Sequence, residues 1–321
     1  MSRASGLVVT ALTVAGVFGQ ATGASAGPAA CEIGELPTPA GTVAATVDGA
    51  TPDGRTLTGF AITGLDPVDG TAVLWRDGAI SRTVEDAPSA LLDLNSRGDG
   101  AGAANGHSWV YRDGVVQDLP GAGTATAIGE SGQVVGSRLE PTPNGPPVAV
   151  PVVWAADGMT DLPRPGGQTG RALDIAADGT IVGELGVDAY TWRPDGTHGP
   201  LPRPAGVPPA GKAGAERITG PWVIGYAGGP VRWHLPDGTA EQVGELQFSV
   251  DAVNERGWMV GEGANPGALA IIDGQPVQLP PHPGLRGLRL VSISSDGTTF
   301  GGTAYDRPSM SERPVQWRCG P

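Results

Sequence analysis

The residues that most often carry out chemistry are few in this 321-residue chain, and they are widely spaced. Four histidines lie in different parts of the sequence, at positions that do not match the short His spacings of zinc enzymes. They are His107, His198, His234 and His282. No serine-nucleophile or phosphate-loop motif accompanies them. We therefore predict no metal site, no cofactor and no catalytic residue, while a composite site that forms only on folding stays open as an alternative.

Aspartate recurs beside glycine along the chain, which raises the question of calcium binding. Examples are Asp53-Gly54, Asp178-Gly179 and Asp296-Gly297. A calcium loop needs several oxygen ligands within about a dozen residues, whereas each of these segments carries one acid. Because Asp and Gly are also the residues that tight turns favour, the pattern predicts turns and not metal sites.

The only two cysteines, Cys31 and Cys319, lie near opposite ends of the sequence. In an oxidising compartment this pair predicts a disulfide that joins the two ends of the chain. A lipid attached to Cys31 is an alternative, since Ala29 and Ala30 are small enough to precede a lipidated cysteine. A metal pair or a catalytic thiol is less favoured, because neither cysteine has a second thiol or a histidine beside it.

The first residues match an export signal. Arg3 precedes an apolar run over residues 7–18, and Ala24-Ser25-Ala26 supplies the small residues that a signal peptidase accepts. We predict a signal peptide over residues 1–26 and a secreted, extracellular chain from residue 27 to residue 321 that forms one domain. An uncleaved anchor is the alternative, although the apolar run is shorter than the ~20 residues of a membrane span.

Composition narrows the classes of protein further. The chain has 53 glycines and 31 prolines, too many for a helical bundle, and its 39% of hydrophobic residues suffices for a core. The 33 acidic against 20 basic residues argue against a nucleic-acid partner, which needs a basic face.

One unit recurs seven times with a period of roughly 40 residues. Ala172–Gly183 and Ala127–Gly136 are two of its copies. Each copy contains a turn glycine, and two further positions recur with the same period: a second glycine shortly after the turn and an aromatic residue after that. We call these positions the second glycine column and the aromatic column. The glycines are Gly59, Gly102, Gly136, Gly183, Gly225, Gly261 and Gly301, and the aromatic column is Trp75, Tyr111, Trp154, Trp192, Trp233, Ile271 in a weaker copy, and Trp317. We expect these glycines to let neighbouring sheets approach and the tryptophans to fill the gap between them.

Each copy holds four short apolar runs between turn residues, which predicts four strands per repeat. Seven such repeats predict an all-β, seven-bladed β-propeller, with an open solenoid as the alternative. The last copy stops at Cys319 after its third strand, whereas an unmatched strand-like segment, residues 33–37, precedes the first copy. We therefore predict that this N-terminal strand completes the last blade, which would leave no open sheet edge.

The repeats resemble HAF repeats, an extracellular repeat family named for a His-Ala-Phe triplet before its tryptophan. The resemblance is carried by Val153–Leu162 and Ala172–Gly183 and covers most of residues 31–319. The triplet itself is absent, since Pro151-Val152-Val153 and Asp188-Ala189-Tyr190 occupy the matching positions. Because the biochemical role of the family is poorly defined, the resemblance implies secretion and a repeat fold but no activity.

The loops on one side of the predicted ring vary widely, and variable loops on a fixed scaffold are where binding residues often lie, although neutral drift explains them equally well. Five arginines and a histidine fall in these loops: Arg164, Arg171, His282, Arg286, Arg307 and Arg313. Arginine forks suit carboxylates, so we predict that these residues bind an extracellular glycan or protein. The alternatives are a background of surface arginines and an extracellular lyase or hydrolase with a composite site around His282.

Overall fold

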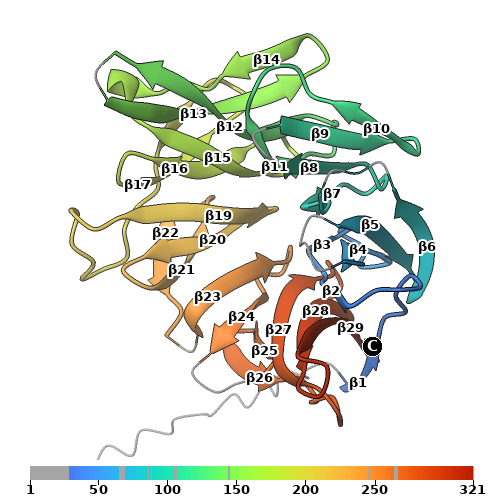
Figure 1. Ribbon diagram of the computed structural model, residues 1–321. Coiled ribbons are helices and arrows are strands. Elements are labelled where there is room, and N and C mark those ends of the chain that lie inside the picture. The colour runs from blue at the N-terminus through green and yellow to red at the C-terminus, as the bar shows by residue number, and fades with distance from the viewer. Residues whose placement is uncertain are drawn as a thin grey trace, which may run out of the picture.

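The computed structural model describes residues 29–64, 69–85, 87, 89–104, 107–143, 145–244, 246–263 and 267–320. The predicted signal peptide, residues 1–26, lies outside them. The described chain folds into seven antiparallel sheets arranged in a ring, and each sheet forms one blade (Figure 1). Helical structure within this part of the chain is limited to one 3-10 turn, Pro165–Gly167. The prediction of an all-β, seven-bladed propeller is confirmed.

Each blade has four strands, numbered here from the ring axis outward. In blade 1 the first strand is split into β2 (Ala44–Ala45) and β3 (Gly49–Ala50), followed by β4 (Thr56–Ile62), β5 (Gly70–Arg76) and β6 (Ala79–Val84). Blade 2 contains β7 (Asp93–Leu94), β8 (Gly100–Ala104), β9 (His107–Arg112) and β10 (Val115–Asp118). Blade 3 contains β11 (Thr124–Ile128), β12 (Val134–Thr142), β13 (Gly145–Ala155) and β14 (Gly158–Asp161).

The remaining four blades follow the same order. Blade 4 contains β15 (Gly170–Ile175), β16 (Ile181–Leu185), β17 (Asp188–Trp192) and β18 (His198–Pro200), and blade 5 contains β19 (Ala213–Thr219), β20 (Trp222–Ala227), β21 (Pro230–His234) and β22 (Thr239–Gln242). Blade 6 contains β23 (Leu246–Val253), β24 (Met259–Gly263), β25 (Leu269–Ile272) and β26 (Gln275–Gln278), and blade 7 contains β27 (Arg286–Ile293), β28 (Thr299–Asp306), β29 (Ser311–Gly320) and β1 (Ala29–Glu35).

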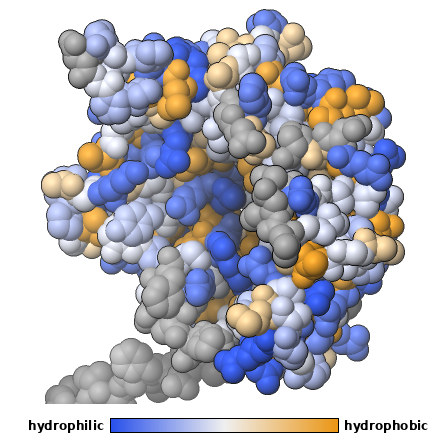
Figure 2. Space-filling model, in the orientation of Figure 1, coloured by the Kyte–Doolittle hydropathy of each residue, from blue (hydrophilic) through white to orange (hydrophobic). Residues whose placement is uncertain are grey.

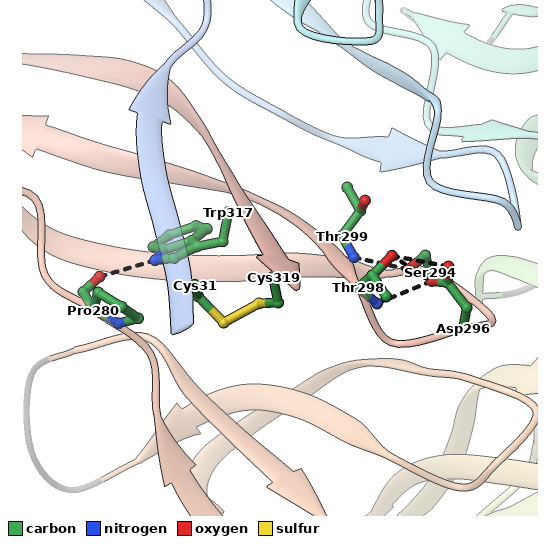
Figure 3. The surroundings of a disulfide bond; sticks show 8 residues. All are labelled: Cys31, Pro280, Ser294, Asp296, Thr298, Thr299, Trp317 and Cys319. Atoms are coloured by element: carbon green, nitrogen blue, oxygen red, sulfur yellow. Dashed lines mark hydrogen bonds between the residues drawn. A yellow bond between two sulfur atoms is a disulfide. The ribbon is translucent and has the colours of Figure 1, made fainter. Parts of the chain in front are cut away.

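The N-terminal strand closes the ring as predicted. β1 pairs antiparallel with β29 and so becomes the outermost strand of blade 7. Cys31 and Cys319 are partners in this pairing and form a disulfide, across a sequence separation of 288 residues (Figure 3). The covalent bond stands where a tight turn joins the third and fourth strands of other blades.

The turns between first and second strands repeat one geometry. In blade 4, Gly179 has a positive φ of 88° and donates its N–H to the carbonyl of Ala176 at 2.9 Å. The carboxylate of Asp178 accepts the N–H of Thr180 at 2.8 Å within the same turn. The aspartate in this turn therefore stabilises the turn by accepting a backbone hydrogen bond, in agreement with the turns predicted from the sequence.

Glycine is required in the second glycine column because of the first strand of the same blade, and not, as expected, because neighbouring blades approach each other there. A Cβ added at Gly183 would overlap the backbone oxygen of Arg171, in the first strand of the same blade. That first strand bulges between Ala172 and Asp174, which turns its backbone toward the second strand. In blade 7 the register places Gly302 in this column, opposite Val315, so the assignment of Gly301 was wrong by one residue.

The tryptophan column is buried between blades, as predicted, and also links them by hydrogen bonds. Each indole Nε1 donates to the carbonyl oxygen of the proline that follows the fourth strand of the preceding blade. The pairs are Trp75 with Pro37, Trp154 with Pro120, Trp192 with Pro163, Trp233 with Pro202 and Trp317 with Pro280. The aromatic column and the apolar-Pro endings of the repeat are therefore two halves of one contact, and the buried rings are not exposed for ligand stacking.

Candidate functional site

The two ends of the ring are built from different loops. The turn end consists of the first-to-second strand turns, such as residues 51–55, 176–180 and 294–298, and the third-to-fourth strand turns, such as residues 77–78, 113–114 and 273–274. The loop end consists of second-to-third strand loops, such as residues 186–187, 228–229 and 307–310, and blade connections, such as residues 119–123, 162–169, 201–212 and 279–285. The turn-end segments contain two to five residues, whereas segments at the loop end run up to the twelve residues 201–212.

The centre of the ring is hollow and lined largely by hydrophilic residues (Figure 2). A cavity of about 540 Å³ opens at the loop end of this hollow. It is displaced toward blades 6, 7 and 1, since its wall includes Glu262 of β24, Tyr305 of β28 and Glu312 of β29. A volume of this size is typical of small-molecule sites in proteins. The cavity is therefore the leading candidate for a binding site.

The side chains at the bottom of this cavity come from the first strands. The bulged positions of those strands face the axis, and they include Asp48 in blade 1, Leu173 in blade 4 and Asp251 in blade 6. Asp251 accepts hydrogen bonds from Arg289 and Ser249, both at 2.9 Å. The bulge that requires the glycine column thus also supplies the residues that line the channel.

Burial changes the acidity of the channel carboxylates. Burial raises the pKa of Asp48 to about 6, against a smaller opposing effect of its hydrogen bond from Thr46. Burial, followed by the charge of Asp174, raises the pKa of Asp93 to about 7. The pKa of Asp174 is also raised by burial. Raised pKa values in a cavity are common at functional sites but also occur in structural networks.

Asp93 and Asp174 have structural roles that explain part of this burial. The N–H of Ile128 in blade 3 donates to Asp93 of blade 2 at 2.9 Å, and the N–H of Ile218 in blade 5 donates to Asp174 of blade 4 at 2.7 Å. Each carboxylate therefore fastens its own first strand to that of the next blade. The sequence carried a signal for them, an acid flanked by apolar residues near the end of a first strand, which our sequence analysis missed.

The predicted site residues fall into separate groups at the loop end. Arg286, Arg307 and Arg313 lie in blade 7. In the register of its strands, Arg286 of β27 lies opposite Tyr305 of β28, and Arg313 of β29 lies opposite the adjacent Ala304. Arg164 and Arg171 lie in and just after the connection between blades 3 and 4. The fold therefore brings three of the arginines together and places the other two in a different part of the ring.

Most of these arginines already have acidic neighbours. Arg164 forms an ion pair with Glu140, and Arg171 Nη2 lies 2.6 Å from Glu184 Oε1. Arg313 Nη2 is 3.9 Å from Asp306 Oδ2. Among the described residues, Arg307 is exposed and has no ion-pair partner.

His282 lies in the connection between blades 6 and 7, with Nε2 3.7 Å from Glu35 Oε1 on the outermost strand β1. It is absent from the wall of the central cavity. Elsewhere, His198 contacts Tyr190 and His234 contacts Asp237. Within the described ranges, no group of three or more His, Cys, Asp or Glu side chains could hold a metal ion. No helix among these residues is long and apolar enough to cross a membrane.

Comparison with known proteins supports the β-propeller fold but identifies no family and no function. No protein-family model matches the chain, and no curated protein matches it either. Among solved structures, the β-propeller domain of the Trilobed protease from Pyrococcus furiosus, which has an open velcro topology, is 13% identical with a TM-score of 0.51, over 74% of this chain and 82% of that one.

Two further structures are similar at the same level. YCF48 from Cyanidioschyzon merolae is 14% identical with a TM-score of 0.50, over 89% of this chain and 98% of that one. An acylaminoacyl peptidase in complex with a chloromethyl ketone is 15% identical with a TM-score of 0.50, over 81% of this chain and 50% of that one. At this identity the likeness establishes the fold alone: the chain is a β-propeller.

Proposed function

We propose that this β-propeller is a secreted binding or scaffold module that recognises an extracellular glycan or protein at its loop end. The observation that carries the proposal is the cavity of about 540 Å³, which opens at that end and is walled by Arg289, Tyr305, Glu312 and other charged or polar side chains. Its position follows a general rule, since loops on a rigid scaffold commonly carry binding residues. Secretion rests on the predicted signal peptide and on the resemblance to HAF repeats.

Exposed apolar side chains also gather at the loop end. Val43, Leu139, Val187, Tyr226 and Met310 all lie there, with Met310 76% and Leu139 68% exposed. Two other exposed apolar residues, Ile80 and Val115, lie on outer strands instead. Apolar side chains that water surrounds in the free protein gain most when a partner covers them. Their distribution supports binding at the loop end over binding at the turn end.

An extracellular lyase or hydrolase is a second candidate, and one observation favours it. Asp48 borders the central cavity and its pKa is raised to about 6 by burial, which suits a general acid or base near neutral pH. His282, the centre of the composite site expected from sequence, lies apart from this cavity. A catalytic site in the central cavity would therefore use channel carboxylates and not His282.

A binding screen with variants at both ends tests the proposal. The mature protein is applied to a glycan array and to secreted proteins from its source, and any ligand is then measured against Arg289→Gln and Glu312→Gln. We expect either change to weaken binding about tenfold, while Arg76→Ala with Arg112→Ala at the turn end leaves it unchanged. Equal loss at the turn end would overturn the location, and ligand turnover that Asp48→Asn abolishes would favour the enzyme.

A further inference from the structure

A second cavity lies at the loop end, apart from the central one. It measures about 530 Å³ and shares no lining residue with the central cavity. One side is formed by the long hairpin of β12 and β13, with Leu139 and Ala149, and the other by the start of β15 and the end of β16. We call this cavity, between blade 3 and blade 4, the hairpin groove.

Three charged side chains in the hairpin groove form a compact cluster. Arg171 Nε donates to Glu184 Oε1 at 2.7 Å, and Lys212 Nζ lies 3.1 Å from Glu184 Oε2. Burial alone would raise the pKa of Glu184, but the hydrogen bonds from Arg171 and Lys212 lower it below its usual range. The carboxylate is therefore ionised at neutral pH, and the cluster carries two positive charges and one negative charge.

The two cations remain accessible to a ligand. The side chain of Arg171 is 50% exposed and that of Lys212 is 63% exposed, whereas Glu184 between them is 14% exposed. Each cation uses only part of its donors on Glu184, because a guanidinium has five N–H groups and an ammonium has three. The residues that line the groove thus offer free donors and together carry a net charge of +1, in a protein whose formal net charge is −13.

The remaining wall is suited to a ligand with both hydroxyl and C–H surfaces. Thr124, which is exposed, and Ser137, which is 8% exposed, line the groove with hydroxyl-bearing side chains, and the exposed side chain of Leu139 lies beside them. Gly170 and Gly186 leave the wall free of side chains at two further positions. A single net positive charge matches a carboxylate, which carries one negative charge, better than a phosphate monoester, which carries about two.

We propose that the hairpin groove binds a hydroxylated carboxylate, either a free sugar acid or a uronate unit of a polysaccharide. Arg171 and Lys212 hold the carboxylate, Thr124 and Ser137 contact hydroxyl groups, and Leu139 packs against the C–H face of the ring. The site is separate from the central cavity, so either proposal can fail without the other. Screening by salt should weaken the interaction, because both cations are exposed.

The experiment measures binding by calorimetry with the mature protein and four probes: D-galacturonate, trigalacturonate, D-galactose and maltotriose. We expect both uronates to bind and both neutral sugars to bind at least about tenfold more weakly. Tighter binding of trigalacturonate than of the monomer would identify a polysaccharide as the source of the carboxylate, and equal affinity would identify a free sugar acid. Absence of uronate binding at millimolar concentration, or equal binding of galactose, overturns the proposal.

Variants then locate the site. Arg171→Gln and Lys212→Gln should each weaken galacturonate binding about tenfold, and Glu184→Gln should strengthen it by raising the net charge of the groove to +2. Arg97→Gln is the matched control, because Arg97 is 53% exposed and pairs with a 14% exposed carboxylate, Asp99, at the turn end. Loss on Arg289→Gln with no loss on Arg171→Gln would place the ligand in the central cavity and overturn the proposal.

Lys212 also provides a readout that needs no substitution. It is the only lysine in the sequence, so an amine-acetylating reagent modifies this side chain and the N-terminus alone. Galacturonate should slow acetylation of Lys212 but not of the N-terminus, as followed by peptide mass spectrometry. Unchanged acetylation of Lys212 under saturating uronate would contradict its role in the groove.

Discussion

The turn end and the loop end of the propeller are made from the same seven repeats, yet they differ in what their polar groups do. At the turn end, side chains bind backbone atoms of their own turn or of the next blade: Asn95 Nδ2 donates to Gly129 O at 3.3 Å and Asn254 Nδ2 to Ser294 O at 3.1 Å. At the loop end, Arg171, Lys212 and Arg289 meet carboxylates beside the cavities of about 540 and 530 Å³, whereas the turn-end ion pair of Arg55 with Asp77 borders neither cavity. The first end holds the ring together, which leaves the second free to diverge.

The largest expected effect comes from the disulfide, which replaces a turn at the turn end of blade 7. Cys31→Ser should lower the thermal midpoint, because the bond closes a loop of nearly the whole described chain and such closure contributes up to about 5–6 kcal/mol. Thermal unfolding of the variant beside the reduced native protein measures the effect. Similar midpoints for the oxidised and reduced native protein would contradict it, as would a free thiol found at Cys319.

The glycine column should come next in size. Gly183→Ala should cost about 1–3 kcal/mol of unfolding free energy, because its Cβ would overlap the backbone of the bulged first strand. Gly199→Ala is the control in the same blade, since a Cβ there meets no atom within 4 Å. Urea unfolding of both variants makes the measurement, and equal losses would count against the bulge as the reason for the glycine.

Protonation of Asp93 should give a smaller, pH-dependent effect. Its pKa rises from 3.8 to about 7 on folding through burial and then the charge of Asp174, so the folded protein binds a proton that the unfolded chain releases between these values. This contribution to stability is complete below pH 3.8 and is lost as the pH rises through about 7. Asp93→Asn should flatten the decline in urea midpoint between pH 5 and pH 8, and an unaltered slope would refute the assignment.

Acids with lowered pKa values titrate in a separate pH range, whereas Asp48, with its pKa raised to about 6, contributes to the same decline in both proteins, so only the difference between the native protein and Asp93→Asn reports on Asp93. Hydrogen bonds from His234 and Thr239 lower the pKa of Asp237 to about 2. Stability from such groups is present above their unfolded pKa, near 4, and is lost as the pH falls below it. Their titration therefore lies below the pH range proposed for Asp93.

The smallest effect should come from an exposed ion pair at the turn end. Arg55 Nη2 lies 2.9 Å from Asp77 Oδ2, but both side chains are more than half exposed. Because water and salt screen such pairs, Arg55→Ala should leave the thermal midpoint within experimental error. A clear drop in the midpoint would show that surface charges, and not only buried polar groups, hold the turn end together.

The sequence alone was enough to predict the seven blades, the strand order within a blade and the closure by an N-terminal strand, which was expected at residues 33–37 and lies at Ala29–Glu35. Each of these rests on local patterns, namely turn glycines, alternating apolar runs and the matching halves of one repeat, which need no knowledge of distant neighbours. The pairing of Cys31 with Cys319 followed from the same alignment of the two ends. The hydrogen bond between each tryptophan and the preceding apolar-Pro ending was missed, although both columns were visible in the sequence.

Only the tertiary structure decided which side chains share a site. Arg171 and Glu184 face each other because the register of β15 and β16 sets them opposite, and Lys212 joins them from the start of the next blade. His282 was placed beside Glu35 because ring closure brings β1 to the edge of blade 7. The repeat pattern predicts the strands of each blade and the closure of the ring, but not the strand bulges or which side chains of neighbouring blades meet, so the candidate sites could be identified only in the tertiary structure.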